Sequence, residues 1–253
     1  MFLSVFDIFK IGIGPSSSHT MGPMTAAVRF LQLLRVRREG ARPASLHVKL
    51  YGSLAFTGKG HATDRAVAIG LLGYTPANLD PDEAEARLIA LKHEKILRSA
   101  GLPALAFDPG KDIVFDYGPA LPGHANGLVF EALDNEGRLC LTETFHSIGG
   151  GFIVTAAERQ TPGSAHSSAA AYWPYPFESA GSMLRMAKES GLSIAAMKRA
   201  NELVARQPRD VDEGIARIWA AMNGCIDRGL ALARTSPRHD LRSCRRPGSS
   251  SLH

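Results

Sequence analysis

Apolar residues follow two spacings along the chain, and these divide it into a mixed first part and a helical second part. A repeat of about three to four residues predicts helices, at residues 21–39, 63–72 and 81–100 and, in the second part, at 177–190, 193–206 and 210–231. Short or alternating apolar runs between turn residues predict strands, at residues 45–54, 112–117, 128–133, 138–145 and 147–154. The first part is therefore predicted to have an α+β (mixed α/β) fold.

The helical part has more apolar surface than it can bury by itself. Ile218, Trp219 and Met222 belong to an apolar stripe along residues 210–231. Three helices with such faces need more covering surface than about fifty residues supply. Cys225 shares the stripe, so we expect it to be a small buried residue and not a metal ligand.

The apolar repeat stops at Arg234, after which Arg, Ser and Pro dominate. We predict four segments, a β domain at 1–155, a linker at 156–176, an incomplete helical α domain at 177–232 and a disordered tail at 233–253. The tail has two interpretations, a natural basic tail or an out-of-frame end of a truncated reading frame. We favour the second, because the preceding helix stops before its domain is complete.

Composition narrows the class of protein. Of the 253 residues, 45% are hydrophobic and 21% are charged, which is typical of a soluble globular protein. The net charge is +5, but five arginines lie in the last twenty residues, so we expect no nucleic-acid partner. No uncharged apolar stretch approaches the roughly 20 residues that cross a bilayer, and the N-terminus lacks the features of a signal peptide. We therefore expect a cytoplasmic protein that does not associate with membranes.

The three cysteines, Cys140, Cys225 and Cys244, are far apart and form no C-x-x-C pair. A [4Fe–4S] cluster needs at least three thiolates that converge on one site. We therefore assign no metal ligand in this chain. Unpaired thiols are consistent with a reducing compartment.

A run of hydroxyl and imidazole side chains leads into the first predicted helix. Glycine and proline residues frame the run, which consists of Ser16, Ser17, Ser18, His19 and Thr20. The unpaired N–H groups and the positive dipole end of a helix start favour an anion, so these residues are candidate ligands of a carboxylate or phosphate. An equally good interpretation is that one serine caps the helix and the others belong to an ordinary loop. The dipole should also disfavour protonation of His19.

A second glycine-rich loop follows the strand predicted at 45–54. Lys59, His61 and Thr63 supply a cation, a possible base and a hydroxyl, but the glycine after Lys59 breaks the Walker pattern, so we expect no nucleotide. The alternative is that His61 is a surface residue beside a capped helix. Because two such loops occur in one domain, we predict that they converge on one cavity for a small carboxylate.

Two shorter segments complete the set of candidate loops. One is His124-Ala125-Asn126-Gly127, and the other is Ser147-Ile148-Gly149-Gly150-Gly151. A triple glycine after a strand lets a ligand or another backbone approach closely, although it can equally be a bulge or a hinge.

Taken in order, these motifs resemble the signatures of the one-chain iron–sulfur L-serine dehydratases. The segments are SVFDIFKIGIGPSSSHTMGPM, YGSLAFTGKGHATD, HANG, SIGGGFIV, YPF and WAAMNGCIDRG, and they span about residues 2–230. The resemblance implies an N-terminal β domain like an allosteric substrate-binding module. An all-helical catalytic α domain, which carries the cluster cysteines, would follow it.

The resemblance implies an L-serine ammonia-lyase of amino-acid catabolism and gluconeogenesis. Such an enzyme converts L-serine to pyruvate and ammonia with a [4Fe–4S] cluster and without PLP. It implies His61 as the base or a proton relay, with Lys59, Thr63, His124 and Asn126 binding the carboxylate or stabilising negative charge on it. The family also implies a possible homodimer.

After CIDRGL the sequence departs from the family pattern. The cluster cysteines would lie beyond His253, so we expect a truncated form that is inactive by itself. The alternative, from a different class of protein, is a stand-alone domain that binds serine or a similar small carboxylate and has a regulatory role.

Overall fold

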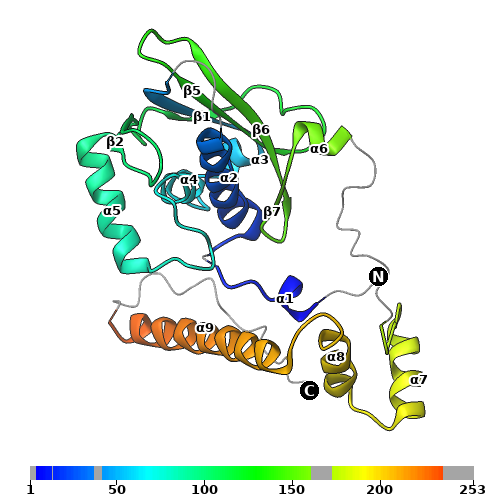
Figure 1. Cartoon of the computed structure of the whole chain (residues 1–253). Helices are drawn as coiled ribbons and strands as arrows, with labels where there is room; N and C mark the ends of the chain where they lie inside the picture. The colour runs from blue at the N-terminus through cyan, green and yellow to red at the C-terminus, as the bar shows by residue number, and fades with distance from the viewer. Residues whose placement is uncertain (1–3, 13, 37–41, 161–172, 236–253) are drawn as a thin grey trace, which may run out of the picture. The chain divides into compact units, whose positions relative to one another are not determined.

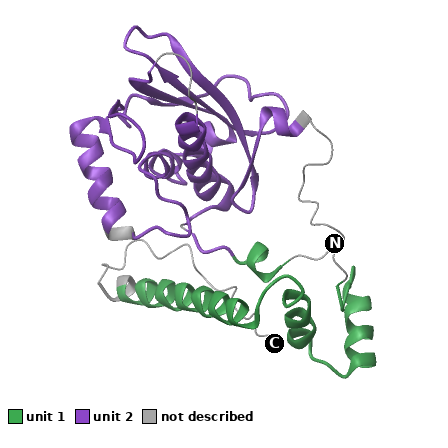
Figure 2. Cartoon of the chain, viewed as in Figure 1, with its two compact units in different colours: residues 1–9, 172–253 green, residues 10–171 purple. Residues whose placement is uncertain are grey.

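The computed structural model describes residues 4–12, 14–36, 42–160 and 173–235. The chain forms two compact units, shown in different colours in Figure 2. Residues 10–171 form one of them, called the sheet unit here. Residues 1–9 and 172–253 form the other, the helical unit. Each unit is described by itself, and the domain boundaries predicted from the sequence stay predictions.

A mixed sheet is the framework of the sheet unit. Its strands are β1 (Ser45–Gly52), β2 (Ile96–Leu97), β3 (Leu105–Ala106), β4 (Ile113–Asp116), β5 (Asn126–Leu133), β6 (Leu139–Gly149) and β7 (Phe152–Thr155). The order is β2-β3-β1-β5-β6-β7, and β4 also pairs with β1. β1 runs parallel to β3 and β4, whereas β1, β5, β6 and β7 pair antiparallel in succession. The carboxyl end of β1, the start of β5 and the end of β6 therefore meet at one edge.

Helices cover one face of this sheet. The helices of the sheet unit are η1 (Ser17–Met21, a π-helix), α2 (Gly22–Val36), α3 (Ser53–Thr57), α4 (Thr63–Leu71), α5 (Pro81–Glu94) and α6 (Ala156–Gln160). Figure 1 shows α2 and α4 side by side next to the sheet. Strand β1 alternates accordingly, because Leu46, Val48 and Leu50 are buried and the residues between them are half-buried.

Three aromatic rings lie at the centre of the core between α2 and the sheet. Phe30 of α2 stacks on Phe130 of β5 with 5.2 Å between ring centroids, and Phe130 meets Phe145 of β6 edge-on at 5.8 Å. All three side chains are fully buried. Burial of each ring contributes about 1.5–3 kcal/mol, so these contacts fix α2 on the sheet.

The helical unit contains α1 (Val5–Ile8), α7 (Ala180–Ser190), α8 (Ile194–Glu202) and α9 (Pro208–Thr235). Within it, a buried carboxylate at the end of α8 joins α8 to the N-terminal segment. Glu202 accepts hydrogen bonds from Ser4 Oγ at 2.8 Å, from the Val5 amide at 2.6 Å and from Arg206 at 2.8 Å. Because three donors surround it, the buried charge of Glu202 is compensated.

The apolar stripe of α9 is exposed over most of its length. Val211 is buried and Gly214 lies against Phe6, but Trp219 is 60% exposed. Cys225 is also exposed, so its predicted burial is wrong. The reason is that the described part of this unit covers only the first turns of α9. Among the described residues, no helix combines the length and apolar character needed to cross a membrane.

The predicted α+β fold is confirmed, with two corrections to its elements. The helix predicted at 81–100 ends at Glu94, because Lys95 adopts a left-handed φ of 55° and β2 follows. The strand predicted at 147–154 does not begin at Ser147. Instead β6 continues to Gly149, and glycines 149–151, all with positive φ, form the turn into β7. Of the predicted tail, residues 233–253, the part from residue 236 onward lies outside the described residues.

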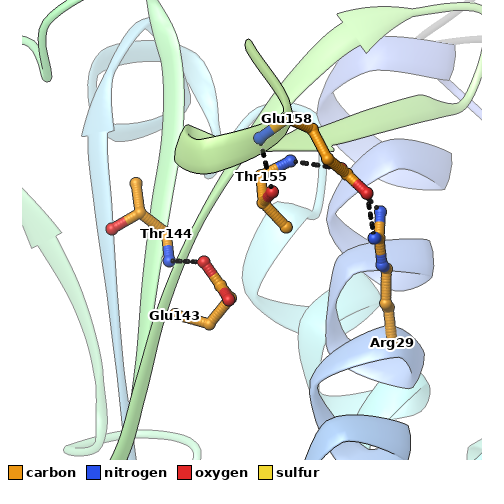
Figure 3. Close-up of polar contacts among 5 residues, drawn as sticks. All are labelled: Arg29, Glu143, Thr144, Thr155 and Glu158. Carbon is orange, nitrogen blue, oxygen red and sulfur yellow. Dashed lines mark hydrogen bonds and ion pairs between the residues drawn. The ribbon is translucent and has the colours of Figure 1, made fainter. Parts of the chain in front are cut away.

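An ion pair attaches α6 to α2. Figure 3 shows the Glu158 carboxylate between the Arg29 guanidinium and Thr155. Glu158 Oε2 accepts from Arg29 Nη1 at 3.1 Å and from the Thr155 amide at 2.9 Å, and the Glu158 amide donates to Thr155 Oγ1 at 3.1 Å. The hydrogen bonds from Arg29, followed by the one from the Thr155 amide, lower the pKa of Glu158 from 4.5 to about 2.

We predict that Glu158→Gln removes part of the acid sensitivity of the fold. A carboxyl whose pKa is lowered by folding contributes stability above its unfolded value of 4.5, and this contribution is lost as the pH falls towards about 2. Since about a third of each partner's side chain is exposed, solvent screening reduces the contribution to about 1–2 kcal/mol. Urea unfolding at several pH values measures it.

The matched control is Glu143→Gln. The Glu143 carboxylate accepts a hydrogen bond from the adjacent Thr144 amide at 2.9 Å and is drawn beside the pair in Figure 3. The control should keep the wild-type pH dependence. An unchanged pH dependence in Glu158→Gln would contradict the stabilising role of the ion pair.

Candidate functional site

The hydroxyl-rich run forms a tight turn at the start of α2. Ser16 is the N-cap of the π-helical turn η1, and its Oγ accepts from the His19 amide at 3.2 Å. Ser16 and Ser18 are half-buried, and Ser17 is exposed. One serine therefore does cap the helix, as the simpler interpretation of the sequence proposed, while the other two keep hydroxyls near the helix start.

The turn is fastened to the end of β6 by a single buried hydroxyl. Ser147 Oγ donates to the Ser18 carbonyl at 2.7 Å, and Ser147 is fully buried. Gly22 is the residue that permits this contact, because a Cβ at this position would overlap the Ser147 side chain. The close approach of backbone and hydroxyl sets the position of η1 on the sheet.

His19 lies between two serine hydroxyls. Its Nδ1 is 2.9 Å from Ser18 Oγ, and its Nε2 is 3.0 Å from Ser53 Oγ, at the start of α3. Burial is the main cause that lowers the pKa of His19, the positive charge of His61 is the second, and a hydrogen bond with Ser53 opposes them. The neutral form therefore predominates at pH 6.5 and above, as the sequence predicted, although burial is the leading cause.

The two predicted loops lie against each other. The rings of His19 and His61 have centroids 4.8 Å apart. Thr20 Oγ1 donates to the His61 carbonyl at 3.0 Å, and Thr63 Oγ1 donates to the His19 carbonyl at 2.6 Å. The two loops are thus in contact, while the shared cavity for a small carboxylate stays a prediction. Thr20 and Thr63 are buried and tie the loops together, so their contact with a ligand stays a prediction.

The hydrogen bond of His61 defines which of its nitrogens can take up a proton. His61 Nδ1 is 2.9 Å from the Thr57 carbonyl, which can only accept, so Nδ1 carries the hydrogen. In the neutral ring the lone pair is then on Nε2. This is the arrangement that a general base requires.

Lys59 contacts an aromatic ring. Its side chain is exposed, and Nζ lies 5.5 Å from the centroid of the Phe115 ring. This cation–π contact holds the Lys59 ammonium group against a ring of β4. The contacts of Lys59 therefore do not join it to His19 and His61, and its catalytic role stays a prediction.

His124 and Asn126 lie at the same edge of the sheet. Asn126 Nδ2 donates to the Ser147 carbonyl at 3.1 Å, and the Asn126 amide donates to His124 Nδ1 at 3.1 Å. Ser147 thus connects this pair to the turn through its carbonyl and hydroxyl. The roles of His124 and Asn126 towards a substrate stay predictions.

Sequence reasoning assigned no individual role to two residues of this neighbourhood, Ser53 and Ser147. Ser53 follows a strand-ending glycine, Gly52, whose φ of 58° makes the sharp turn that aims Ser53 towards His19. Ser147 lies two residues before the glycine run. Both are serines at a strand end before or after glycine, and that signal was present but was interpreted only as loop geometry.

The described residues do not supply the thiolates of an iron–sulfur cluster. Such a cluster needs at least three converging thiolates. Cys140 is buried in β6, Cys225 is exposed on α9, and Cys244 lies outside the described residues. No group of three His, Cys, Asp or Glu side chains in the described ranges is arranged to hold a metal ion. We therefore derive no chemical step through a cluster.

Comparison with known proteins connects this geometry to one family. Residues 4–158 match the family described as "Serine dehydratase beta chain". The chain belongs to this family. The matched residues include η1, both histidine loops and Ser147, so the whole candidate site lies within the family segment.

Similar proteins include an L-serine dehydratase of Streptomyces coelicolor, 42% identical over 234 residues, which are 91% of this chain and 50% of that protein. The L-serine dehydratase TdcG of Escherichia coli is 43% identical over 236 residues, 90% of this chain and 49% of that protein. An L-serine dehydratase of Haemophilus influenzae is 36% identical over 90% of this chain. The chain spans about half the length of the curated relatives it matches.

We predict that the pKa of His19 lies below 6.5 and rises in His61→Gln without returning fully to 6.5. The substitution removes the positive charge of His61, while burial, the larger cause, remains. Titration of the imidazole Cε1–H signals by NMR measures both values. His47→Gln, on a histidine that pairs with Asp112, is the control and should leave His19 unchanged. A normal or raised pKa for His19 in the wild type would refute the burial argument.

Proposed function

We propose that the sheet unit supplies substrate recognition and proton transfer in an L-serine ammonia-lyase. The reaction removes water from L-serine, and the aminoacrylate formed hydrolyses to pyruvate and ammonia. The observation that carries the proposal is that His19 and His61 meet beside the Ser16–Thr20 turn, inside the segment that matches the serine dehydratase β chain. The names of the relatives support the same substrate.

The turn is suited to the carboxylate of the substrate. It offers the hydroxyls of Ser16 and Ser18 at a helix start, where unpaired N–H groups and the dipole favour an anion. A neutral His19 adds no charge of its own, and its ring shares hydrogen bonds with the hydroxyls of Ser18 and Ser53. We infer that Ser16, Ser17, Ser18, His19 and Thr20 form the carboxylate subsite, with Thr63 and Asn126 at its border. The predicted ligand His124 is left out of this subsite, because its ring lies against His146.

His61 is the group that we assign to the proton on Cα. Its Nδ1–H is fixed on the Thr57 carbonyl, so the lone pair on Nε2 is available to accept a proton. Loss of this proton leaves negative charge that spreads from Cα onto the substrate carboxylate, where hydrogen-bond donors stabilise it. Dependence on an iron–sulfur cluster follows from the family resemblance alone, and its thiolate ligands are not found among the described residues.

A second candidate function is binding of a small carboxylate without turnover, as in a regulatory domain. The observation that favours it is that the Ser16–Thr20 turn places serine hydroxyls and a half-buried His19 at a helix start, as a carboxylate ligand alone would require. A cytoplasmic location, expected from the sequence, and a homodimer, implied by the resemblance, remain part of the proposal.

We predict that this chain alone forms no pyruvate from L-serine. The measurement uses protein purified anaerobically and treated with iron and sulfide. Mixing it with a separately expressed piece of the Streptomyces coelicolor relative, the part that this chain does not match, should restore turnover. In that mixture His61→Ala should lower the rate by about 10²–10⁴, the contribution of a general base.

Arg217→Gln is the control variant, since Arg217 is an exposed residue of α9 outside the matched segment. It should leave the restored rate unchanged. Turnover by the chain alone, with a stoichiometric cluster, would overturn the proposed division of labour. Full activity of His61→Ala would remove His61 from the role of base.

A further inference from the structure

His146 of β6 lies on the face of the sheet opposite α2. Its neighbours Phe145 and Ser147 both point to the helix-covered face, where Phe145 packs in the core and Ser147 binds the η1 turn. Successive side chains of a strand point to opposite faces, so His146 points away from them. It is nevertheless only 2% exposed, and its Nδ1 has no hydrogen-bond partner among the described residues.

The loop before β5 brings a second histidine over this face. The rings of His124 and His146 have centroids 6.3 Å apart in an edge-to-face arrangement. His124 Nδ1 accepts from the Asn126 amide, so in the neutral ring the hydrogen is on Nε2. His124 therefore presents a donor to its surroundings.

Arg159 of α6 adds a permanent positive charge. Its guanidinium lies directly on the backbone of Gly123, whose φ is +100°, and a Cβ there would be 2.7 Å from Arg159 Cζ. Among the described residues no carboxylate pairs with Arg159. The preceding residue, Glu158, is held by Arg29 and Thr155 (Figure 3), so the start of α6 and hence Arg159 are fixed in place.

The protonation state of His146 leaves its ring one N–H with which to donate a hydrogen bond to an anion. Burial is the main cause that lowers the pKa of His146, followed by the positive charges of Arg159 and His124. The ring is therefore neutral near neutral pH and carries one N–H. A buried ring nitrogen without a partner is unfavourable, and an acceptor oxygen against the ring would supply the missing hydrogen bond.

We propose that Arg159, His124 and His146 bind a small oxyanion, a carboxylate or inorganic phosphate, on the face of the sheet opposite α2. A guanidinium without a carboxylate partner, together with two imidazole N–H donors, is the donor set that such an anion requires. This site is separate from the η1 turn, because the sheet lies between them. It stands independently of the proposed lyase function.

The test is an NMR titration of the whole chain with sodium phosphate and, in a second arm, sodium acetate. The imidazole signals of His124 and His146 should shift saturably with a Kd on the order of 1 mM, and the arm that saturates first identifies the preferred anion. The signals of His19 and His61 report separately on the η1 turn. If that turn does not bind an anion, the His124 and His146 signals should still shift on titration.

Variants connect the shifts to the named side chains. Arg159→Gln should weaken binding at least about tenfold, as loss of a charge-assisted pair does, whereas Arg217→Gln, which removes an exposed arginine of α9, should not. His146→Phe should lose binding and still fold, because it replaces a buried ring whose Nδ1 is unpaired. No saturable shift of His124 and His146 in either arm, or equal affinity in Arg159→Gln, would overturn the proposal.

Discussion

The hydrogen bond from Ser147 to the Ser18 carbonyl is the contact on which the candidate site depends. It joins the end of β6 to the turn before α2, and Gly22 leaves just enough room for it. Because α2 is also fixed by the Phe30–Phe130 stack, the turn is held at both ends. Its hydroxyls and His19 therefore lie at a defined place beside the end of β1 and the start of β5.

Neighbouring loops are assembled around that fixed turn by buried hydroxyls. Thr20 and Thr63 each donate a hydrogen bond to a backbone carbonyl of the opposite loop, and these bonds bring His61 against His19. The two imidazoles then differ in their partners. His19 is buried between serines, while His61 is oriented by a carbonyl that leaves Nε2 available. The proposed function assigns recognition to His19 and proton transfer to His61 on the basis of this difference.

Much of the fold could be predicted from local patterns, and so could the convergence of the two glycine-framed loops. What the sequence could not show depends on backbone geometry or on long-range packing. The left-handed φ of Lys95 ends α5 early, and Ser147 acquires its role only through a partner 129 residues away. Cys225 fits an apolar stripe that the described part of its unit does not cover. His146 gave no local signal, since its burial follows from the loop and helix that lie over it.

The most direct test of the central claim is calorimetric titration of the chain with L-serine and with L-serinamide, which lacks the carboxylate. The account predicts saturable binding of L-serine, at least about tenfold weaker binding of L-serinamide, and a similar loss for L-serine in Ser16→Ala, because charge-assisted hydrogen bonds at the helix start are removed. Equal binding of the two compounds, or no saturable binding of L-serine, would contradict the assignment of the Ser16–Thr20 turn as a carboxylate site.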